Sequence, residues 1–174
     1  MILRMYYAGV GSRDTPLSVQ RGMKLIALFL ETEGYILRSG GADGADLAFE
    51  EGVKNPANKD IYLHKKGFNG SKSTLYNVCD AARAMARAIH PAPHKLNAGS
   101  LGLHARNCYQ VLGLDLNTPA NFVVCWTDGG KPVGGTRTAI MLAKKNNIPV
   151  LNLFGCTTAE ECFKKFLNFY DFYN

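Results

Sequence analysis

The sequence lacks the patterns of several common protein classes. No apolar run approaches the roughly 18 residues of a membrane span, because the longest candidate, Leu25–Leu30, is far too short. The five cysteines form no CxxC pair and no His has a ligand spacing with them, so no metal site is expected. The N-terminus has no basic segment followed by an apolar stretch, so we expect a cytoplasmic protein without a signal peptide.

Two nucleotide-binding signatures are absent as well. The GxGxxG pattern fails because Asp14 stands at the third glycine position after Gly9 and Gly11, and no GxxxxGK[ST] pattern occurs. The sequence therefore predicts neither a GxGxxG-type dinucleotide-binding domain nor a P-loop nucleotide hydrolase, and no cofactor is expected.

Positive charge is concentrated in one part of the chain. The net charge of the 174 residues is +6, and residues 64–106 carry seven Lys or Arg against a single acidic residue, Asp80. The parts on either side are close to neutral. This asymmetry favours an anionic partner, either a phosphorylated ligand or nucleic acid, although a solvated basic face has the same composition.

Apolar runs and amphipathic segments alternate along the chain. Its length and 47% hydrophobic content suit a single domain spanning residues 1–174. The pattern predicts strands at 3–10, 35–38, 60–64, 121–126 and 148–153. It predicts helices at 17–33, from the 39–46 turn to about 53, and at 74–89, 101–112, 135–146 and 158–170. This order predicts an α/β fold with a Rossmann-like, doubly wound, mainly parallel sheet in three α/β/α layers.

Three glycine-containing loops stand where a predicted strand ends and a helix begins, at residues 9–13, 39–44 and 134–137. In a parallel sheet such loops converge at the carboxyl ends of the strands, where ligands bind. Their backbone N–H groups and hydroxyls suit a phosphate. The candidate ligand-binding residues at this edge are Gly11, Ser12, Arg13, Ser39, Gly40, Gly41, Ala42, Asp43, Arg106, Thr127, Asp128, Gly134, Gly135, Thr136 and Arg137.

Carboxylates are scarce near these loops. Asp43 and Asp46 are three residues apart at the start of the second predicted helix, so they are expected to share a face. They can hold ribose hydroxyls or act as acid and base, which makes Asp43, Asp46 and Arg106 the candidate catalytic residues. The alternative is that both carboxylates only stabilise the positive end of the helix.

The same segments resemble a known superfamily. The motifs YAGVGSR (7–13), LRSGGADGAD (37–46), LHARN (103–107), CWTD (125–128), GGT (134–136) and IPVLNL (148–153) are similar to those of the SLOG superfamily. That group includes DNA-processing protein A (DprA) and the Lonely Guy (LOG) phosphoribohydrolases. The stand-alone DprA-like proteins of bacteriophages are the most similar members. The resemblance covers residues 5–155 and implies a Rossmann-like sheet with a nucleotide bound at the glycine turns.

The LOG branch implies a catalytic role for some of these residues. The loop 134–136 stands where the superfamily holds phosphate, and Arg106 is a counterpart of the LOG arginine. LOG enzymes carry a catalytic Glu three residues after that threonine, whereas this chain has Ala139. One of Asp43, Asp46 and Asp128 would have to replace that Glu.

The DprA branch implies a different partner. DprA proteins bind single-stranded DNA and load a recombinase, a role that the basic segment suits. SLOG relatives often dimerise, so a homo-oligomer is expected. The apolar segment 163–173 is then either an interface or only a closure of the core.

Three functions remain open at this point. The first is binding of a phosphorylated nucleotide-type ligand, as a sensor, a sponge or a nucleotide-processing protein. The second is a nucleoside 5′-monophosphate N-glycosidase. The third is a single-stranded DNA-binding recombination mediator. No membrane partner is expected.

Overall fold

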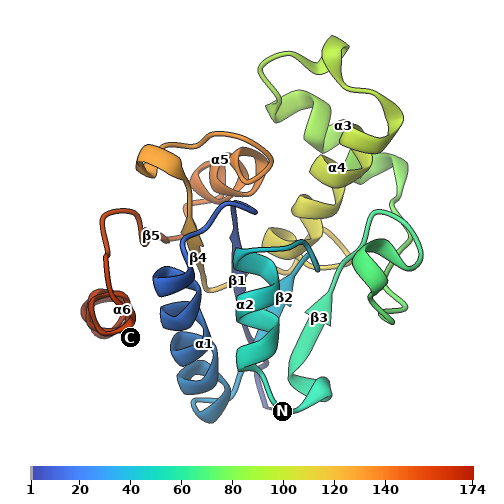
Figure 1. Ribbon diagram of the computed structural model, residues 1–174. Coiled ribbons are helices and arrows are strands. Elements are labelled where there is room, and N and C mark those ends of the chain that lie inside the picture. The colour runs from blue at the N-terminus through green and yellow to red at the C-terminus, as the bar shows by residue number, and fades with distance from the viewer. Residues whose placement is uncertain (1) are drawn as a thin grey trace.

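The computed structural model describes residues 2–174 and shows a five-stranded sheet with helices on both faces (Figure 1). The strands lie in the order β3-β2-β1-β4-β5, and each neighbouring pair is parallel. Their bounds are β1 (Met5–Gly11), β2 (Tyr35–Ser39), β3 (Lys59–Ile61), β4 (Phe122–Trp126) and β5 (Val150–Asn152). This order confirms the doubly wound, Rossmann-like sheet.

Helices cover both faces of the sheet, which gives the predicted three-layer architecture (Figure 1). One face carries α1 (Leu17–Thr32), α2 (Ala45–Gly52) and α6 (Ala159–Tyr173). The opposite face carries α4 (Ala98–Leu112) and α5 (Arg137–Lys145), and α3 (Asp80–Ile89) packs on these two helices. Among residues 2–174, no helix combines the length and apolar character that crossing a bilayer requires.

The central strands are apolar on both faces because both faces are covered. Along β1, Tyr7 joins the core under α1, α2 and α6, while its neighbour Ala8 joins the core under α3, α4 and α5. Along β4, Phe122 and Val123 divide in the same way. Successive strand residues point to opposite faces, so a continuous apolar run supplies both cores.

The predicted helix at 74–89 starts later than expected. Helix α3 begins at Asp80, after Cys79 caps it by accepting a 3.4 Å hydrogen bond from the Ala82 N–H. The preceding segment is tied to the end of β3 instead. The Ser73 hydroxyl donates to the Ile61 carbonyl at 2.6 Å, and the Leu63 N–H donates to the Leu75 carbonyl at 2.8 Å. These contacts override the helical propensity of residues 74–79.

Only some of the aromatic side chains of the C-terminal helix α6 pack into the core. Phe166 is fully buried, whereas Phe172 and Tyr173 are exposed. Closure of the core therefore explains part of the apolar segment 163–173. The homo-oligomer stays a prediction.

Candidate functional site

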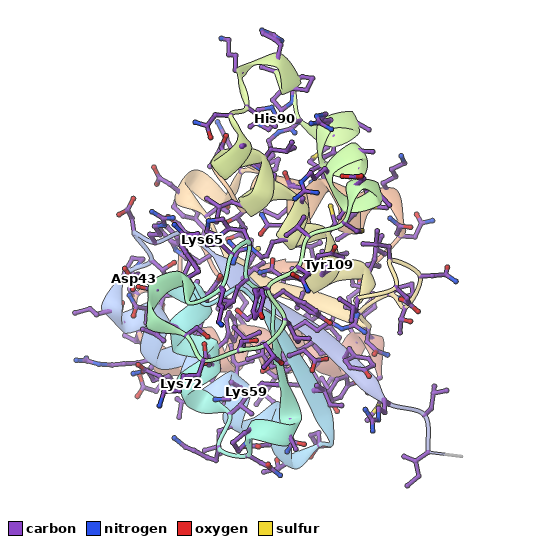
Figure 2. All side chains as sticks on the ribbon, turned by 90° about the vertical axis from the view of Figure 1, so that its right-hand side faces the viewer. Asp43, Lys59, Lys65, Lys72, His90 and Tyr109 are labelled. Atoms are coloured by element: carbon purple, nitrogen blue, oxygen red, sulfur yellow. The ribbon has the colours of Figure 1, made fainter. Side chains whose placement is uncertain are left out.

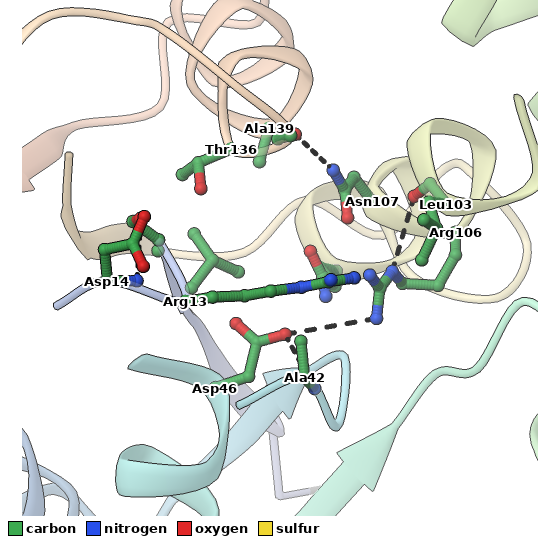
Figure 3. Close-up of a pocket in the computed structure, with 14 residues that line it drawn as sticks. Arg13, Asp14, Ala42, Asp46, Leu103, Arg106, Asn107, Thr136 and Ala139 are labelled. Carbon is green, nitrogen blue, oxygen red and sulfur yellow. Dashed lines mark hydrogen bonds and ion pairs between the residues drawn. The ribbon is translucent and has the colours of Figure 1, made fainter. Parts of the chain in front are cut away.

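A cavity of about 340 Å³ lies at the carboxyl ends of the central strands (Figure 3). Its walls come from the loop after β1, the start of α2, one side of α4 and the start of α5. The lining residues are Val10, Gly11, Ser12, Arg13, Asp14, Ala42, Asp46, Leu103, Arg106, Asn107, Gln110, Gly135, Thr136 and Ala139. Both the position and the volume are typical of small-ligand sites in α/β proteins.

Arg106 provides a buried positive charge in this wall. Only 5% of the residue is exposed. Its Nη1 donates to the carbonyls of Gly40 and Tyr62, and its Nε donates to the Leu103 carbonyl at 3.4 Å. Neutral carbonyls thus hold a guanidinium whose nearest carboxylate oxygen, in Asp46, is 3.9 Å away.

Asp46 is the buried acid of the cavity. It is 4% exposed, and its Oδ2 accepts a 3.4 Å hydrogen bond from the Ala42 N–H. Burial raises the pKa of Asp46 to about 6, although Arg106 opposes the rise by stabilising the carboxylate. The side chain therefore changes its charge just below neutral pH, within the range that suits a general acid.

Arg13 brings a second guanidinium to the same space. Figure 3 shows its side chain extending from the loop after β1 toward Arg106. Burial lowers the pKa of Arg106, Asp46 counteracts this, and the positive charge of Arg13 lowers it further. Two guanidiniums that repel each other across one cavity favour an anion between them.

The Arg106 and Gln110 side chains of α4 pack closely against the turn after β2. A Cβ at Gly40 would collide with Arg106 Nη1 and with Gln110 Nε2. The absence of a side chain at Gly40 therefore lets two α4 residues pack against this turn. Gly40 lies behind the cavity wall and is not one of its lining residues.

The structure brings about half of the predicted site residues together. Those that line the cavity are Gly11, Ser12, Arg13, Ala42, Asp46, Arg106, Gly135 and Thr136. Those outside its lining are Ser39, Gly40, Gly41, Asp43, Thr127, Asp128, Gly134 and Arg137.

Several residues outside the lining make structural hydrogen bonds. The Ser39 hydroxyl donates to the Gly9 carbonyl at 2.6 Å, and the Thr127 hydroxyl accepts from Asn152 Nδ2 at 2.6 Å. Arg137 Nη1 donates to the Ile89 carbonyl at 2.9 Å. These side chains fix the backbone around the carboxyl edge.

The expectation that Asp43 and Asp46 share a helix face is wrong. Helix α2 begins at Ala45, so Asp43 precedes it and the helical spacing does not apply. A left-handed backbone at Gly44, with φ 79°, separates the two carboxylates. Asp43 is exposed and accepts a 2.9 Å hydrogen bond from Asn69 Nδ2, whereas Asp46 faces the cavity.

One side of α4 lines the cavity, and most of its residues were not predicted from the sequence. Leu103, Arg106, Asn107 and Gln110 all line the cavity, but only Arg106 was among the predicted residues. Their spacing of three, four and seven residues marks one side of a helix, and that signal was available in the sequence. Asn107 Nδ2 donates to the Gly135 carbonyl at 2.7 Å and so joins α4 to the third glycine loop.

Ala139 also lines the cavity, at the position where the resemblance to LOG enzymes places a catalytic Glu. No other carboxylate replaces it from the start of α5. Asp46 and Asp14 supply the acidic side chains of the lining.

The first part of the basic segment, residues 64–72, adjoins the cavity. Asn69 Nδ2 donates to the Gly41 carbonyl at 3.0 Å, and the Phe68 ring lies 5.9 Å from the Arg106 guanidinium. Burial lowers the pKa of His64, and the charges of Arg106, Lys65 and Arg13 lower it further. Figure 2 shows Lys65 on the same side of the molecule as Asp43.

The exposed cations at this edge have no acidic partner among residues 2–174. Within residues 2–174, the ion pairs shorter than 4 Å are Lys24–Glu51, Arg83–Asp80 and Arg106–Asp46. Lys65, Lys66 and Arg13 are exposed and belong to none of them. Their charges remain available to an anionic partner.

No protein-family model matches the sequence, and no curated protein is significantly similar to it. A solved structure of DNA processing protein A (DprA) from Helicobacter pylori is similar in three dimensions. The two chains are 16% identical with a TM-score of 0.58, and the match covers 98% of this chain and 79% of the other. The chain has a DprA-like fold. The H. pylori protein is described as binding single-stranded DNA.

The similarity to DprA predicted from the glycine loops is thus confirmed at the level of the fold. In the described residues of this DprA-like fold, no cluster of three or more His, Cys, Asp or Glu is arranged to hold a metal ion. The cavity offers cations, hydroxyls and amides, which suit a phosphate and a polar organic group.

Proposed function

We propose that this protein binds single-stranded DNA at the carboxyl edge of the sheet, with one nucleotide in the cavity. The observation that carries the proposal is the convergence of Arg13 and Arg106 on one cavity. The segment 64–72, which contacts this region through Phe68 and Asn69, adds the exposed Lys65 and Lys66. The fold that the chain shares with a single-stranded DNA-binding protein supports it.

The proposed contacts divide into two kinds. Arg13, Lys65 and Lys66 bind phosphates along the strand, and this contribution depends on salt because bound counterions are released. Ser12 and Thr136 add hydroxyl donors inside the cavity, where the N-terminus of α5 also favours negative charge. Phe68 is half-buried, with its ring centre 4.6 Å from that of His64 and 5.9 Å from the Arg106 guanidinium, and it offers a ring on which a base can stack.

The test is the salt dependence of binding. Fluorescence anisotropy of a labelled oligo(dT) is measured between 50 and 200 mM NaCl, with the duplex of the same length for comparison. We expect log Kobs to fall linearly with log[NaCl] by about 0.7 for each phosphate contact, and the duplex to bind more weakly. Absence of binding to oligo(dT) at 50 mM NaCl would contradict the proposal.

A matched pair of variants locates the interface. Lys65→Ala/Lys66→Ala removes two exposed charges beside the cavity. Lys144→Ala/Lys145→Ala removes two exposed charges from the last turn of α5, at the opposite edge of the sheet. Only the first double variant should lower both the affinity and the salt slope. Equal effects of the two would show that net charge alone drives binding.

A free phosphorylated nucleotide is the second candidate ligand. The cavity of about 340 Å³ with buried Arg106 and Asp46 favours it, because a small ligand is enclosed there more completely than a long strand. Isothermal titration calorimetry with nucleoside monophosphates tests this candidate. Binding of a monophosphate at micromolar Kd, with no affinity for oligo(dT), would favour it over the first proposal.

Cleavage of such a ligand would depend on Asp46. In this reaction the N-glycosidic bond breaks and the departing base takes the proton of the Asp46 carboxyl. The water oxygen bonds to the ribose C1′, and the proton that this water loses returns to the Asp46 carboxylate. Chromatography for the free base measures the activity. Asp46→Asn should abolish it, whereas Asp43→Asn, outside the cavity, should leave it unchanged. The reverse pattern would reject Asp46 as the acid.

A further inference from the structure

Gln110 is a buried polar residue without a structural partner. The residue is 1% exposed and lines the cavity from α4. Neither its Oε1 nor its Nε2 has a hydrogen-bond partner among residues 2–174. A buried amide without partners is costly and uncommon, so the position requires an explanation.

The neighbouring polar residues of α4 differ from Gln110 in this respect. Arg106 donates to the turn after β2, and Asn107 donates to the Gly135 carbonyl. Both side chains therefore hold loops in place. Gln110 packs against Gly40 but donates to no loop, so loop positioning does not account for its carboxamide.

We propose that Gln110 recognises the nucleobase of the nucleotide held in the cavity, an inference that rests on the proposed function. A carboxamide presents an acceptor and a donor side by side. Nucleobase edges carry the complementary donor and acceptor, and glutamine binds such an edge through two hydrogen bonds. A phosphodiester has no donor and cannot satisfy Oε1, so the base is the part of the nucleotide that matches.

The same cavity then recognises two parts of one nucleotide. Arg13 lies at the exposed side of the cavity and suits a phosphate, whereas Gln110 lies in its buried wall. Base recognition therefore adds to the salt-dependent contacts and should itself depend little on salt, since the carboxamide is uncharged.

The experiment compares oligo(dT) with an abasic oligonucleotide of the same length and backbone charge. Gln110→Met removes both hydrogen-bonding atoms and keeps a side chain of similar length. The native protein should bind oligo(dT) about 10- to 100-fold more tightly than the abasic strand. Gln110→Met should reduce this preference about 10-fold and leave the part that stacking on Phe68 contributes, while its affinity for the abasic strand is unchanged.

Gln20→Met is the matched control, because Gln20 Nε2 donates to the Thr15 carbonyl at 2.7 Å and Gln20 is not a lining residue. This variant should keep the preference for oligo(dT). Thermal unfolding checks that both variants are folded.

A second measurement uses the native protein alone and so does not depend on the folding of a variant. Thymine is replaced in the oligonucleotide by difluorotoluene, a nonpolar group of the same shape that stacks but forms only weak hydrogen bonds. We expect about 10-fold weaker binding of this strand by the native protein. Equal affinity for the two strands would overturn the role of Gln110.

These outcomes distinguish a failure of the proposed DNA binding from a failure of the proposed role of Gln110. If the native protein binds neither oligo(dT) nor the abasic strand, the proposed function falls, and the inference falls with it. If it binds both equally, or if Gln110→Met keeps the native preference for oligo(dT) undiminished, the role of Gln110 is wrong while DNA binding stands.

Discussion

The core under α1, α2 and α6 contains six buried aromatic side chains, whereas the core under α3, α4 and α5 contains two, Tyr62 and Tyr109, among small and aliphatic side chains. Tyr7, Phe122 and Phe166 are fully or almost fully buried in the first core. In the second, Ala105 and Ala139 are fully buried. The buried polar residues of α4 lie on the second face, at the carboxyl edge of the sheet.

Because of this difference, we expect the first core to contribute most to the stability of the fold and the opposite face to contribute most to binding. The aromatic face buries more apolar area in each side chain, and that burial stabilises the fold. The opposite face uses small residues, which leaves room for polar side chains beside the sheet. Substitutions on the two faces should therefore affect different measurements.

The largest effect is expected on the aromatic face. Phe166→Ala leaves a cavity where a fully buried ring packs, so the free energy of unfolding should fall by about 3–5 kcal/mol. Urea denaturation measures it. Affinity for oligo(dT) should be unchanged wherever the variant is folded. Phe172→Ala, at a ring that is 79% exposed, should stay within about 0.5 kcal/mol of the native protein.

Arg106→Met should have the largest effect on binding. It removes a buried positive charge from the cavity and leaves Asp46 without its nearby cation, so oligo(dT) affinity should fall by about 2–4 kcal/mol. Anisotropy titration measures this. Arg83→Met, on α3 and paired with Asp80, is the control and should bind like the native protein. A similar loss in both variants would contradict a specific role for Arg106.

Binding should also depend on pH through Asp46. Because burial raises its pKa to about 6, a rise from pH 5 to pH 7 adds a negative charge to the cavity and should weaken oligo(dT) binding about 10-fold. Asp46→Asn should abolish this step. Burial also lowers the pKa values of His64 and His104. Any pH dependence of binding that persists in Asp46→Asn is therefore assigned to other groups such as these.

The same titration affects stability, with a definite sign. The folded-state pKa of Asp46 lies above its unfolded value, so its contribution is fully present below about pH 4 and is lost as the pH rises through 6. The difference in unfolding free energy between the native protein and Asp46→Asn should therefore change over this range. A constant difference from pH 4 to pH 8 would show that the pKa of Asp46 is not raised.

The smallest effect is expected from Arg13→Ala. Arg13 is exposed at the side of the cavity, so its loss should weaken oligo(dT) binding several-fold and lower the salt slope by about 0.7. Arg21→Ala removes an exposed arginine from α1 and serves as the control. If Arg21→Ala lowers the slope equally, the contacts are not confined to the cavity edge.

The order of strands and helices could be predicted because apolar runs and helical stripes depend on local sequence. The edge that carries the site followed from the parallel sheet, in which the loops after β1 and β2 must meet. Residues 74–79 could not be assigned correctly, since the hydrogen bonds of Ser73 and Leu75 to the end of β3 join segments about 12 residues apart.

It was harder to predict which side chains form the site than to predict where the site lies in the fold. Asp43 and Asp46 look equivalent in the sequence, and only the start of α2 at Ala45 distinguishes them. Gln110 lies in an apolar stretch of α4, where composition suggests core. Only the tertiary structure shows that its side-chain amide has no hydrogen-bond partner among the described residues.

The most direct test of the proposed interface is an NMR titration of the ¹⁵N-labelled protein with oligo(dT). Amide shifts should be confined to the carboxyl edge, at residues 11–14, 40–42, 64–72, 106–110 and 135–136, while α6 and the last turn of α5 stay unchanged. Shifts centred on α6, or the absence of shifts at saturating DNA, would contradict the account.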